Sequence, residues 1–187
     1  MRRIASVLAL GALVAALLYR PAAQAEEIEV RDVALRSVEE GLALDVDFAF
    51  ELTPRLADVV SNGVPLYFRV DFELTRRRWY WFDDTAAAQH LELRLSYHAL
   101  SRQYRLSAGA LQQSFPTLEE ALQVLRRVRN WLVVERGVAL ADADYEAAVR
   151  MRLDTALLPK PFQLSALTGR DLQLDSPWKR FIVRPPP

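Results

Sequence analysis

The sequence predicts an α+β fold, mainly antiparallel β, with two packed sheets in a sandwich-like arrangement and two or three short helices. Most of the chain beyond residue 26 places apolar side chains at every second position, which is the period of a strand with one buried face and one wet face. Two segments that begin with helix-capping threonines interrupt the strands, so helices are inserted between antiparallel hairpins. The 187 residues, 51% of them hydrophobic, suit one domain, which we expect over 26–182, followed by a flexible polyproline tail over 183–187.

Residues 1–25 have the three parts of a secretory signal peptide. Arg2 and Arg3 precede an apolar run of about 15 residues, and the small-x-small sequence AQA ends at Ala25. Because this run is shorter than the roughly 20 residues of a membrane span, we expect cleavage after Ala25 and a periplasmic protein. The alternative is an uncleaved segment that anchors the chain in the inner membrane, with the domain facing the periplasm.

Composition excludes several classes of function. Cleavage would remove three of the 24 basic residues, leaving 21 against 24 acidic ones and a net charge of −3. This balance disfavours nucleic-acid binding, which needs a clustered basic face. The chain has no cysteine, which excludes disulfides, thiolate metal sites and thiol nucleophiles. The few glycines are scattered and form no phosphate-binding motif.

The first strands predict a hairpin. Large apolar residues occupy every second position over 42–50 and alternate with Ala or Asp, as in a half-buried strand. Before it, the apolar residues move from even-numbered positions, ending at Val30, to odd-numbered positions, starting at Val33. This change predicts a β-bulge near Arg31–Asp32. Gly41 supplies the unusual backbone dihedrals of the turn that joins the two strands.

The sequence TPRLADVVSNG predicts a short helix. Thr53 can cap its N-terminus, Pro54 suits the first helical position, and Gly63 can end it. A long strand follows over 64–74, and we expect the sequence DDTAAA, residues 83–88, to break it.

The second half of the chain suggests the same order of strand, strand, helix, strand. A strand over 91–99 turns back near Leu100 into a strand over 104–110. TLEEALQVLRRVRN predicts a helix with Thr117 as its cap, followed by the short buried strand WLVVE and a long strand over 145–153. The prolines of LLPKPFQL then form a rigid link to a short final helix.

The stretch RRRWYWFDD does not continue the alternation of buried and exposed positions in the strand before it. Continued alternation would place Arg76 and Arg78 inward and Trp79 and Trp81 outward, and buried unpaired arginines cost several kcal/mol each. One interpretation is structural: a bulge resets the register, so the tryptophans pack in a corner of the core. In the other, the strand runs beyond the covered sheet and forms an aromatic–arginine platform for a partner or a saccharide.

The platform interpretation defines a candidate binding surface. It joins the RRRWYWFDD stretch to the polar face of the strand 90–98. The candidate residues are Arg76, Arg77, Arg78, Trp79, Trp81, Arg94 and His98. Because Arg, Trp and Tyr dominate binding hot spots, we predict a protein-binding accessory domain. The alternative is a small-ligand or glycan binding module that uses the same side chains.

The chemistry-bearing residues do not form a catalytic constellation. The two histidines, His90 and His98, lie about 26 Å apart on one predicted strand at roughly 3.3 Å per residue, too far to share a metal ion. A hydrolase built on His98 with Ser96 or Ser101 stays open, although no G-x-S-x-G elbow accompanies them. We therefore expect no enzymatic activity, no metal and no cofactor.

Five motifs occur in order along the chain: RRRWYWFDD, LSYHALSRQYRL, SFPTLEEAL, MRLD and LLPKPFQL. Together they resemble a proteobacterial family of signal-peptide proteins whose domain is catalogued as of unknown function, over about residues 26–182. The resemblance implies an exported protein with no assigned activity, cofactor or catalytic residue. Such genes often lie beside a membrane sensor histidine kinase of the nitrogen-regulation type. The implied partner is a periplasmic or inner-membrane protein, either that kinase or another envelope component.

Overall fold

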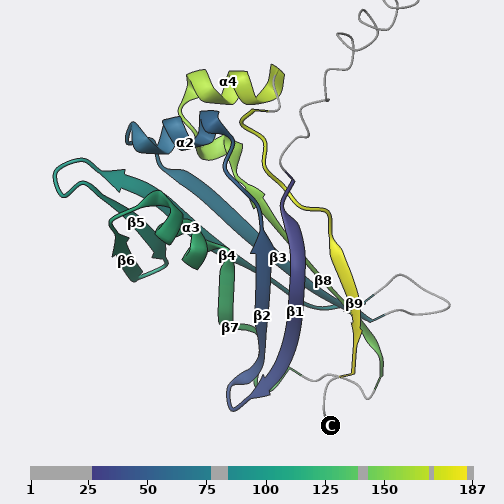
Figure 1. The fold of residues 1–187 in the computed structure, drawn as a ribbon. Helices are drawn as coiled ribbons and strands as arrows, with labels where there is room; N and C mark the ends of the chain where they lie inside the picture. The colour runs from purple at the N-terminus through teal and green to yellow at the C-terminus, as the bar shows by residue number, and fades with distance from the viewer. Residues whose placement is uncertain (1–26, 77–83, 139–142, 169–170, 185–187) are drawn as a thin grey trace, which may run out of the picture.

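Two antiparallel β-sheets pack face to face in the computed structural model, which describes residues 27–76, 84–138, 143–168 and 171–184 (Figure 1). The smaller sheet has the strand order β1-β2-β7, and the larger has the order β6-β5-β4-β3-β8-β9. The strands are β1 (Glu29–Val38), β2 (Gly41–Ala49), β3 (Leu66–Arg76), β4 (Asp84–His98), β5 (Gln103–Ala108), β6 (Leu111–Phe115), β7 (Arg127–Glu135), β8 (Tyr145–Leu153) and β9 (Lys179–Val183). The helices are α2 (Pro54–Ser61), α3 (Leu118–Leu125) and α4 (Lys160–Thr168), with a 3-10 turn, η1 (Thr155–Leu157), before α4. The predicted α+β class is confirmed.

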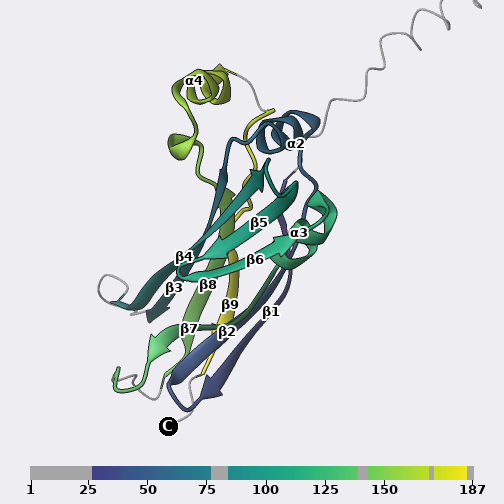
Figure 2. The ribbon, with the colours of Figure 1, turned by 90° about the vertical axis from the view of Figure 1, so that its left-hand side faces the viewer.

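A short helix twice carries the chain from one sheet to the other. β1 and β2 of the smaller sheet lead through α2 to β3 of the larger sheet, and β5 and β6 of the larger lead through α3 to β7 of the smaller. In both views α2 and α4 lie at the same end of the sheets, and β3, β4 and β8 run from there toward the opposite end (Figures 1 and 2). The predicted order of strand, strand, helix, strand is present in the first half, whereas in the second half three strands, β4, β5 and β6, precede the helix.

The β1–β2 hairpin has the predicted bulge and turn. Val30 pairs with Phe48 and Asp32 with Asp47, so Arg31 is the extra residue. Gly41 follows the turn at a φ of 144°, and a Cβ there would lie 1.9 Å from the carbonyl oxygen of Val134. Only glycine fits this place, because both the backbone conformation and the approach of β7 exclude a side chain.

The helix α2 begins as the sequence predicts. The Thr53 hydroxyl accepts the backbone N–H of Leu56 at 3.1 Å, and Pro54 is the first helical residue. Leu56, Val59 and Val60 are buried in the core, which holds the helix on the inner side of the larger sheet. Thr53 also donates to the Asp171 carbonyl at 2.6 Å, which ties the start of α2 to the C-terminal segment.

The core lies between the two sheets. On β3 the fully buried side chains are Leu66, Phe68, Val70, Phe72 and Leu74, all of one parity. Two ring contacts span the sheets: Phe50 stacks on Phe68 at 5.7 Å between centroids, and Phe72 meets the edge of Trp131 at 6.4 Å. These aromatic pairs contribute about 0.5–1.5 kcal/mol each beyond their burial.

The prediction that DDTAAA breaks the strand was wrong. β4 begins at Asp84, opposite Arg76, and its first residues pair with β3. Ala86 and Ala87 pack against the core. Alanine has a low β-propensity, but a long partner strand with apolar residues on one face overrides that preference.

The predicted helix after Thr117 was too long. α3 ends at Leu125, and the following residues form β7, where Asn130 adopts a φ of +50°. Val128 pairs with Val46 of β2, so cross-strand pairing overrides the helical period there. The predicted strand over 104–110 is instead the β5–β6 hairpin, with its turn at Gly109 and Ala110. Strand β9 was not predicted.

Gly41→Ala should destabilise the domain far more than Gly63→Ala. Both glycines have a positive φ, which costs an L-residue roughly 1–2 kcal/mol. At Gly63 nothing lies within 4 Å of the added Cβ, whereas at Gly41 the Val134 carbonyl must move. Urea unfolding of the two variants measures the difference. Equal losses of unfolding free energy would contradict the close approach of β7 to this turn.

Candidate functional site

The RRRWYWFDD stretch is described only at its ends. Residues 77–83 lie outside the described part of the chain, and they include the candidates Arg77, Arg78, Trp79 and Trp81. The choice between core corner and platform therefore stays a prediction. Arg76 is the last residue of β3 and pairs with Asp84 of β4. The register shifts just before it, between Leu74 and Thr75, where the extra residue belongs to β4.

The outer face of the larger sheet carries polar side chains on its central strands. The smaller sheet, α2 and α3 pack against the inner face, so the alternation of β3 leaves its odd-numbered side chains on the outer one. Paired residues of β4, β3 and β8 form rows across this face. In order along β3, the rows are Arg94–Tyr67, Glu92–Arg69–Arg152 and His90–Asp71–Arg150. Three strands thus bring charged residues from distant parts of the sequence into one area.

Three arginines converge on the carboxylate of Asp71, and we call this group the arginine cluster. Arg69 donates from Nε to Oδ1 at 2.6 Å, while Arg150 and Arg152 donate from Nε to Oδ2 at 3.0 and 3.2 Å. The Asp71 side chain is 13% exposed, whereas those of the arginines are 32–37% exposed. The carboxylate is therefore enclosed, and the outer ends of the guanidinium groups reach solvent.

The terminal nitrogens of the cluster remain available. Within the described part of the chain, each of the three arginines uses only Nε in the hydrogen bonds to Asp71, and its two terminal nitrogens have no partner. The three arginines line a hollow of about 240 Å³. Its lining residues are Arg69, Asp71, Phe72, Glu73, Ala88, Gln89, His90, Arg150 and Arg152. Arg150 also lies 4.4 Å over the ring of Trp178, which restricts that guanidinium further.

The cluster sets the ionisation of its carboxylate. Burial alone would raise the pKa of Asp71, but the hydrogen bonds from Arg69, Arg150 and Arg152 outweigh burial and hold the pKa below its ordinary value of 3.8. Asp71 is therefore ionised at neutral pH and neutralises one of three guanidinium charges. With Glu73 also on the rim, the hollow keeps an excess of one positive charge, which favours an anionic ligand.

Arg94 and His98 do not share one site. The Arg94 guanidinium lies 5.8 Å over the ring of Tyr67, in the row beside the arginine cluster. His98 ends β4, where its Nδ1 accepts the backbone N–H of Ser101 at 3.3 Å and lies 3.0 Å from that residue's hydroxyl. These bonds fasten the β4–β5 turn. Of the two histidines it is His90, opposite Asp71, that borders the hollow.

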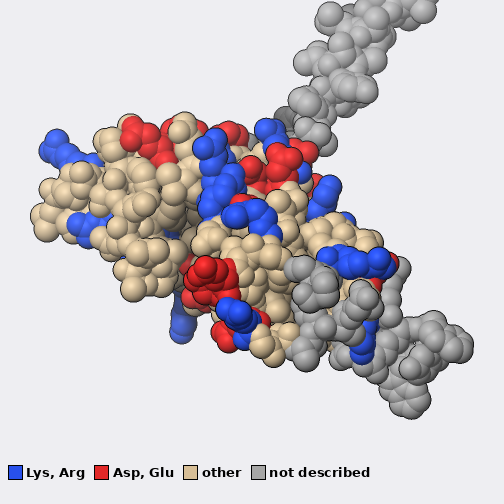
Figure 3. Space-filling model, turned by 90° about the horizontal axis from the view of Figure 1, so that it is seen from below, with Lys and Arg blue, Asp and Glu red and all other residues tan. Residues whose placement is uncertain are grey.

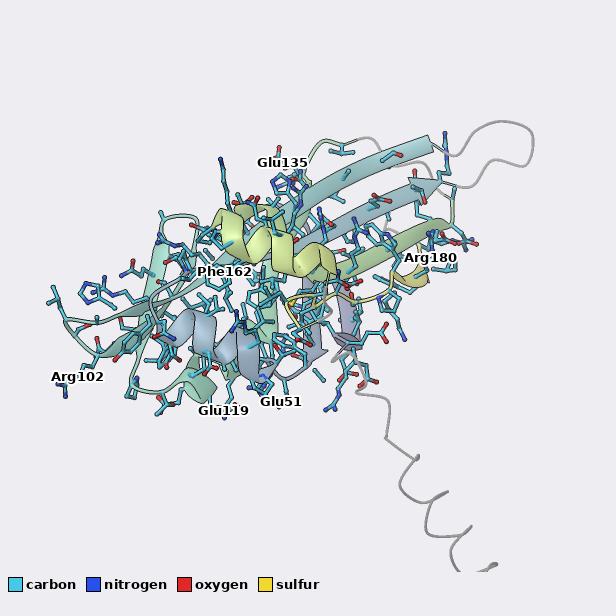
Figure 4. All side chains as sticks on the ribbon, turned by 90° about the horizontal axis from the view of Figure 1, so that it is seen from above. Glu51, Arg102, Glu119, Glu135, Phe162 and Arg180 are labelled. Atoms are coloured by element: carbon cyan, nitrogen blue, oxygen red, sulfur yellow. The ribbon has the colours of Figure 1, made fainter. Side chains whose placement is uncertain are left out.

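Arg126 lines a second groove, of about 380 Å³, together with Arg31 and Arg127. Arg126 donates from all three of its nitrogens: Nε to the Phe50 carbonyl at 2.9 Å, and the terminal nitrogens to Glu119 and Glu51 at 2.9 and 3.0 Å. Figure 4 shows Glu51 and Glu119 side by side at this place. Because its donors are already satisfied, Arg126 joins the end of β2 to α3 and offers little to a ligand.

The sequence contained a signal for the arginine cluster that its analysis missed. Arg69 and Asp71 occupy alternate positions of β3 on the outer, solvent-facing side of the sheet. Arg150 and Arg152 occupy the corresponding positions of β8. Charged residues at alternate positions of two long strands indicate a charged sheet face. Only the β3–β8 pairing, however, identifies Asp71 as the point where they meet.

Comparison with known families gives a single result. A family described as a domain of unknown function, DUF4390, matches residues 25–182. The chain belongs to the DUF4390 family. No curated protein and no solved structure matches the chain.

Two further observations concern the described residues of this DUF4390 domain. No helix among them has the length and apolar character to cross a membrane. On the face seen from below, the basic and acidic side chains of the described residues are interspersed, without a large area of one sign (Figure 3).

Asp71→Asn should lower the free energy of unfolding near neutral pH by about 2 kcal/mol, since it removes the charge that the three arginines surround. The folded-state pKa of Asp71 lies below its unfolded value, so this stabilisation is present above about pH 4 and is lost as the pH falls through the folded pKa. The stability gap between wild type and variant should therefore narrow as the pH is lowered from about 6 toward 3.

Urea unfolding across that pH range measures the gap. Asp32→Asn, at an exposed position on β1, is the matched control and should show a small gap throughout. A gap for Asp71→Asn that stays constant with pH would contradict the ionised cluster.

Proposed function

We propose that this DUF4390 protein is an exported, non-enzymatic accessory domain that binds an acidic segment of another envelope protein. The binding surface is the outer face of the larger sheet, centred on the arginine cluster. The observation that carries the proposal is that the three arginines lining the hollow are held through Nε by Asp71, while their terminal nitrogens have no partner among the described residues.

Guanidinium forks match carboxylates, which they bind with two parallel hydrogen bonds. Free arginine side chains lose about 2 kcal/mol of rotamer entropy when a partner immobilises them. In the cluster the arginines lose much of this rotamer entropy when the domain folds, because Asp71 and Trp178 already orient them. An acidic side chain entering the hollow therefore meets donors that are already in place.

The size of the hollow favours a protein over a small molecule. Pockets that enclose ligands measure about 300–1,000 Å³, whereas this one measures about 240 Å³ and is open to solvent. It holds one or two acidic side chains of a longer segment, with Tyr67, Arg94 and Trp178 nearby to extend the contact. Arginine and aromatic residues are enriched at the centres of protein interfaces.

Export and partner rest on the sequence. The signal-peptide features of residues 1–25 support a periplasmic location, and the family resemblance supports a sensor histidine kinase or another envelope component as the partner. For His98 we propose a structural role, because Ser101 engages its Nδ1 through both the backbone and the hydroxyl within one turn. A serine nucleophile needs a histidine held by a third group on the other ring nitrogen.

In-cell photocrosslinking tests the binding surface. A photoreactive phenylalanine analogue at His90, exposed at the rim of the hollow, should form an adduct with an envelope protein on illumination. The same analogue at Ser37, exposed on β1 of the other sheet, should not. Mass spectrometry should place the adduct in a segment rich in Asp and Glu.

Charge variants give the matched comparison. Arg150→Gln with Arg152→Gln should reduce the His90 adduct about tenfold, corresponding to 1.4 kcal/mol. Arg102→Gln with Arg180→Gln changes the net charge equally at opposite ends of the molecule (Figure 4) and should leave the adduct unchanged. Equal adducts from His90 and Ser37, or equal losses in both double variants, would overturn the proposal.

Export is tested separately. We expect the protein to be released with the periplasmic fraction and its intact mass to begin at Glu26. Replacing Ala23 and Ala25 with bulky residues should block cleavage and retain the chain in the membrane fraction. Recovery of an unprocessed chain from the cytoplasm of the unmodified strain would refute export.

A further inference from the structure

Strand β6 is an exposed sheet edge that lacks the usual protection. Four strands form the edges of the two described sheets, and three of them carry charged side chains: β1, β7 and β9. The sequence of β6, LQQSF, has none, and four of its five residues are exposed. Leu111 alone is 76% exposed. Proteins commonly place charges or proline on an edge because its unpaired N–H and C=O groups can recruit another strand.

The β5–β6 hairpin determines which groups of β6 point outward. Ala108 pairs with Leu111 across a two-residue turn, and Gly109 has a φ of 56°, as such turns require. The residues beside a two-residue turn exchange both backbone hydrogen bonds, and such pairs then alternate along the hairpin. The N–H and C=O groups of Gln112 and Ser114 therefore point away from β5, toward the free edge. Figures 1 and 2 show β6 at the rim of the larger sheet.

We propose that β6 pairs with β6 of a second copy of this chain, antiparallel, about a two-fold axis at Gln113. In this register Gln112 of each copy lies opposite Ser114 of the other, and these residues exchange about four backbone hydrogen bonds. Leu111 lies opposite Phe115 of the second copy on the inner face, so the exposed leucine is covered by an apolar partner.

The strand favours a second copy because it is complementary to itself. Apolar residues meet apolar ones, amides meet a hydroxyl, and no charge is placed opposite a like charge. The small residues Gly109 and Ala110 at the turn leave room beside Pro116, which follows the strand in the other copy. Because the axis is perpendicular to the sheet, the two larger sheets become continuous and their outer faces lie on the same side.

A cysteine trap tests the register. The chain contains no cysteine, so Gln113→Cys introduces a unique thiol. Residues paired across the axis at a site without backbone hydrogen bonds have Cα atoms about 4.5 Å apart, within the range for a disulfide. Mild oxidation of the full chain should link Gln113→Cys into dimers at least tenfold faster than Gln112→Cys or Ser101→Cys. Equal rates for the three variants would overturn the proposal.

Charge pairing provides an independent measurement. By sedimentation velocity at up to about 1 mM, wild type should show a concentration-dependent dimer. Gln113→Lys and Gln113→Glu should each be monomeric, because like charges then face each other across the axis, and a mixture of the two should restore the dimer. A wild-type chain that stays monomeric, or a mixture that does not associate, would refute pairing through β6. Neither result bears on the His90 adduct, which tests the other surface.

Discussion

The register between β3 and its neighbours is the constraint on which both the core and the candidate site depend. In a strand, side chains alternate between faces, so a slip of one residue exchanges the buried and exposed sets. If β8 slipped against β3, Arg150 and Arg152 would enter the core, and Val149 and Met151 would reach solvent. Each buried unpaired charge costs several kcal/mol. A register shifted by one residue would therefore be much less stable than the observed one. The pairing that closes the core therefore also gathers the arginines over Asp71.

In the binding role proposed above, the order of the arginine side chains matters more than the stability that the cluster contributes. One carboxylate balances one of three guanidinium groups, and the arginine side chains are about one-third exposed, so solvent screens much of their attraction and repulsion. What the cluster provides is order: each arginine is held at Nε while its terminal nitrogens stay available. Arg126 shows the opposite arrangement, because each of its three nitrogens donates to an internal acceptor. Arg126 and the three arginines of the cluster differ in which of their nitrogens already donate a hydrogen bond. Counting arginines alone would not show this difference.

Local sequence signals predicted the elements well wherever one physical cause dominates. The bulge at Arg31, the turn at Gly41 and the cap at Thr53 each follow from a single residue or a change of parity. Sequence reasoning failed where a distant strand decides the outcome. β7 begins within a helical pattern because β2 pairs with it, and β4 includes alanines because β3 lies beside them. The arginine cluster was missed for the same reason, since the residues that form it are about 80 positions apart in the sequence and meet only through β3–β8 pairing.

The charge of the whole chain limits how the proposed surface can act. With the predicted cleavage the protein would carry a net charge of −3, and it would not attract an acidic partner over long distances. Charges further apart than about 8 Å are largely screened at physiological salt, and the positive charge of the hollow acts only at contact. Association would thus proceed without electrostatic steering, and selectivity would come from the fit of a carboxylate between oriented guanidinium forks. Such a surface suits a partner kept at high local concentration in the same compartment, and two copies joined through β6 would present two such hollows on one side to it.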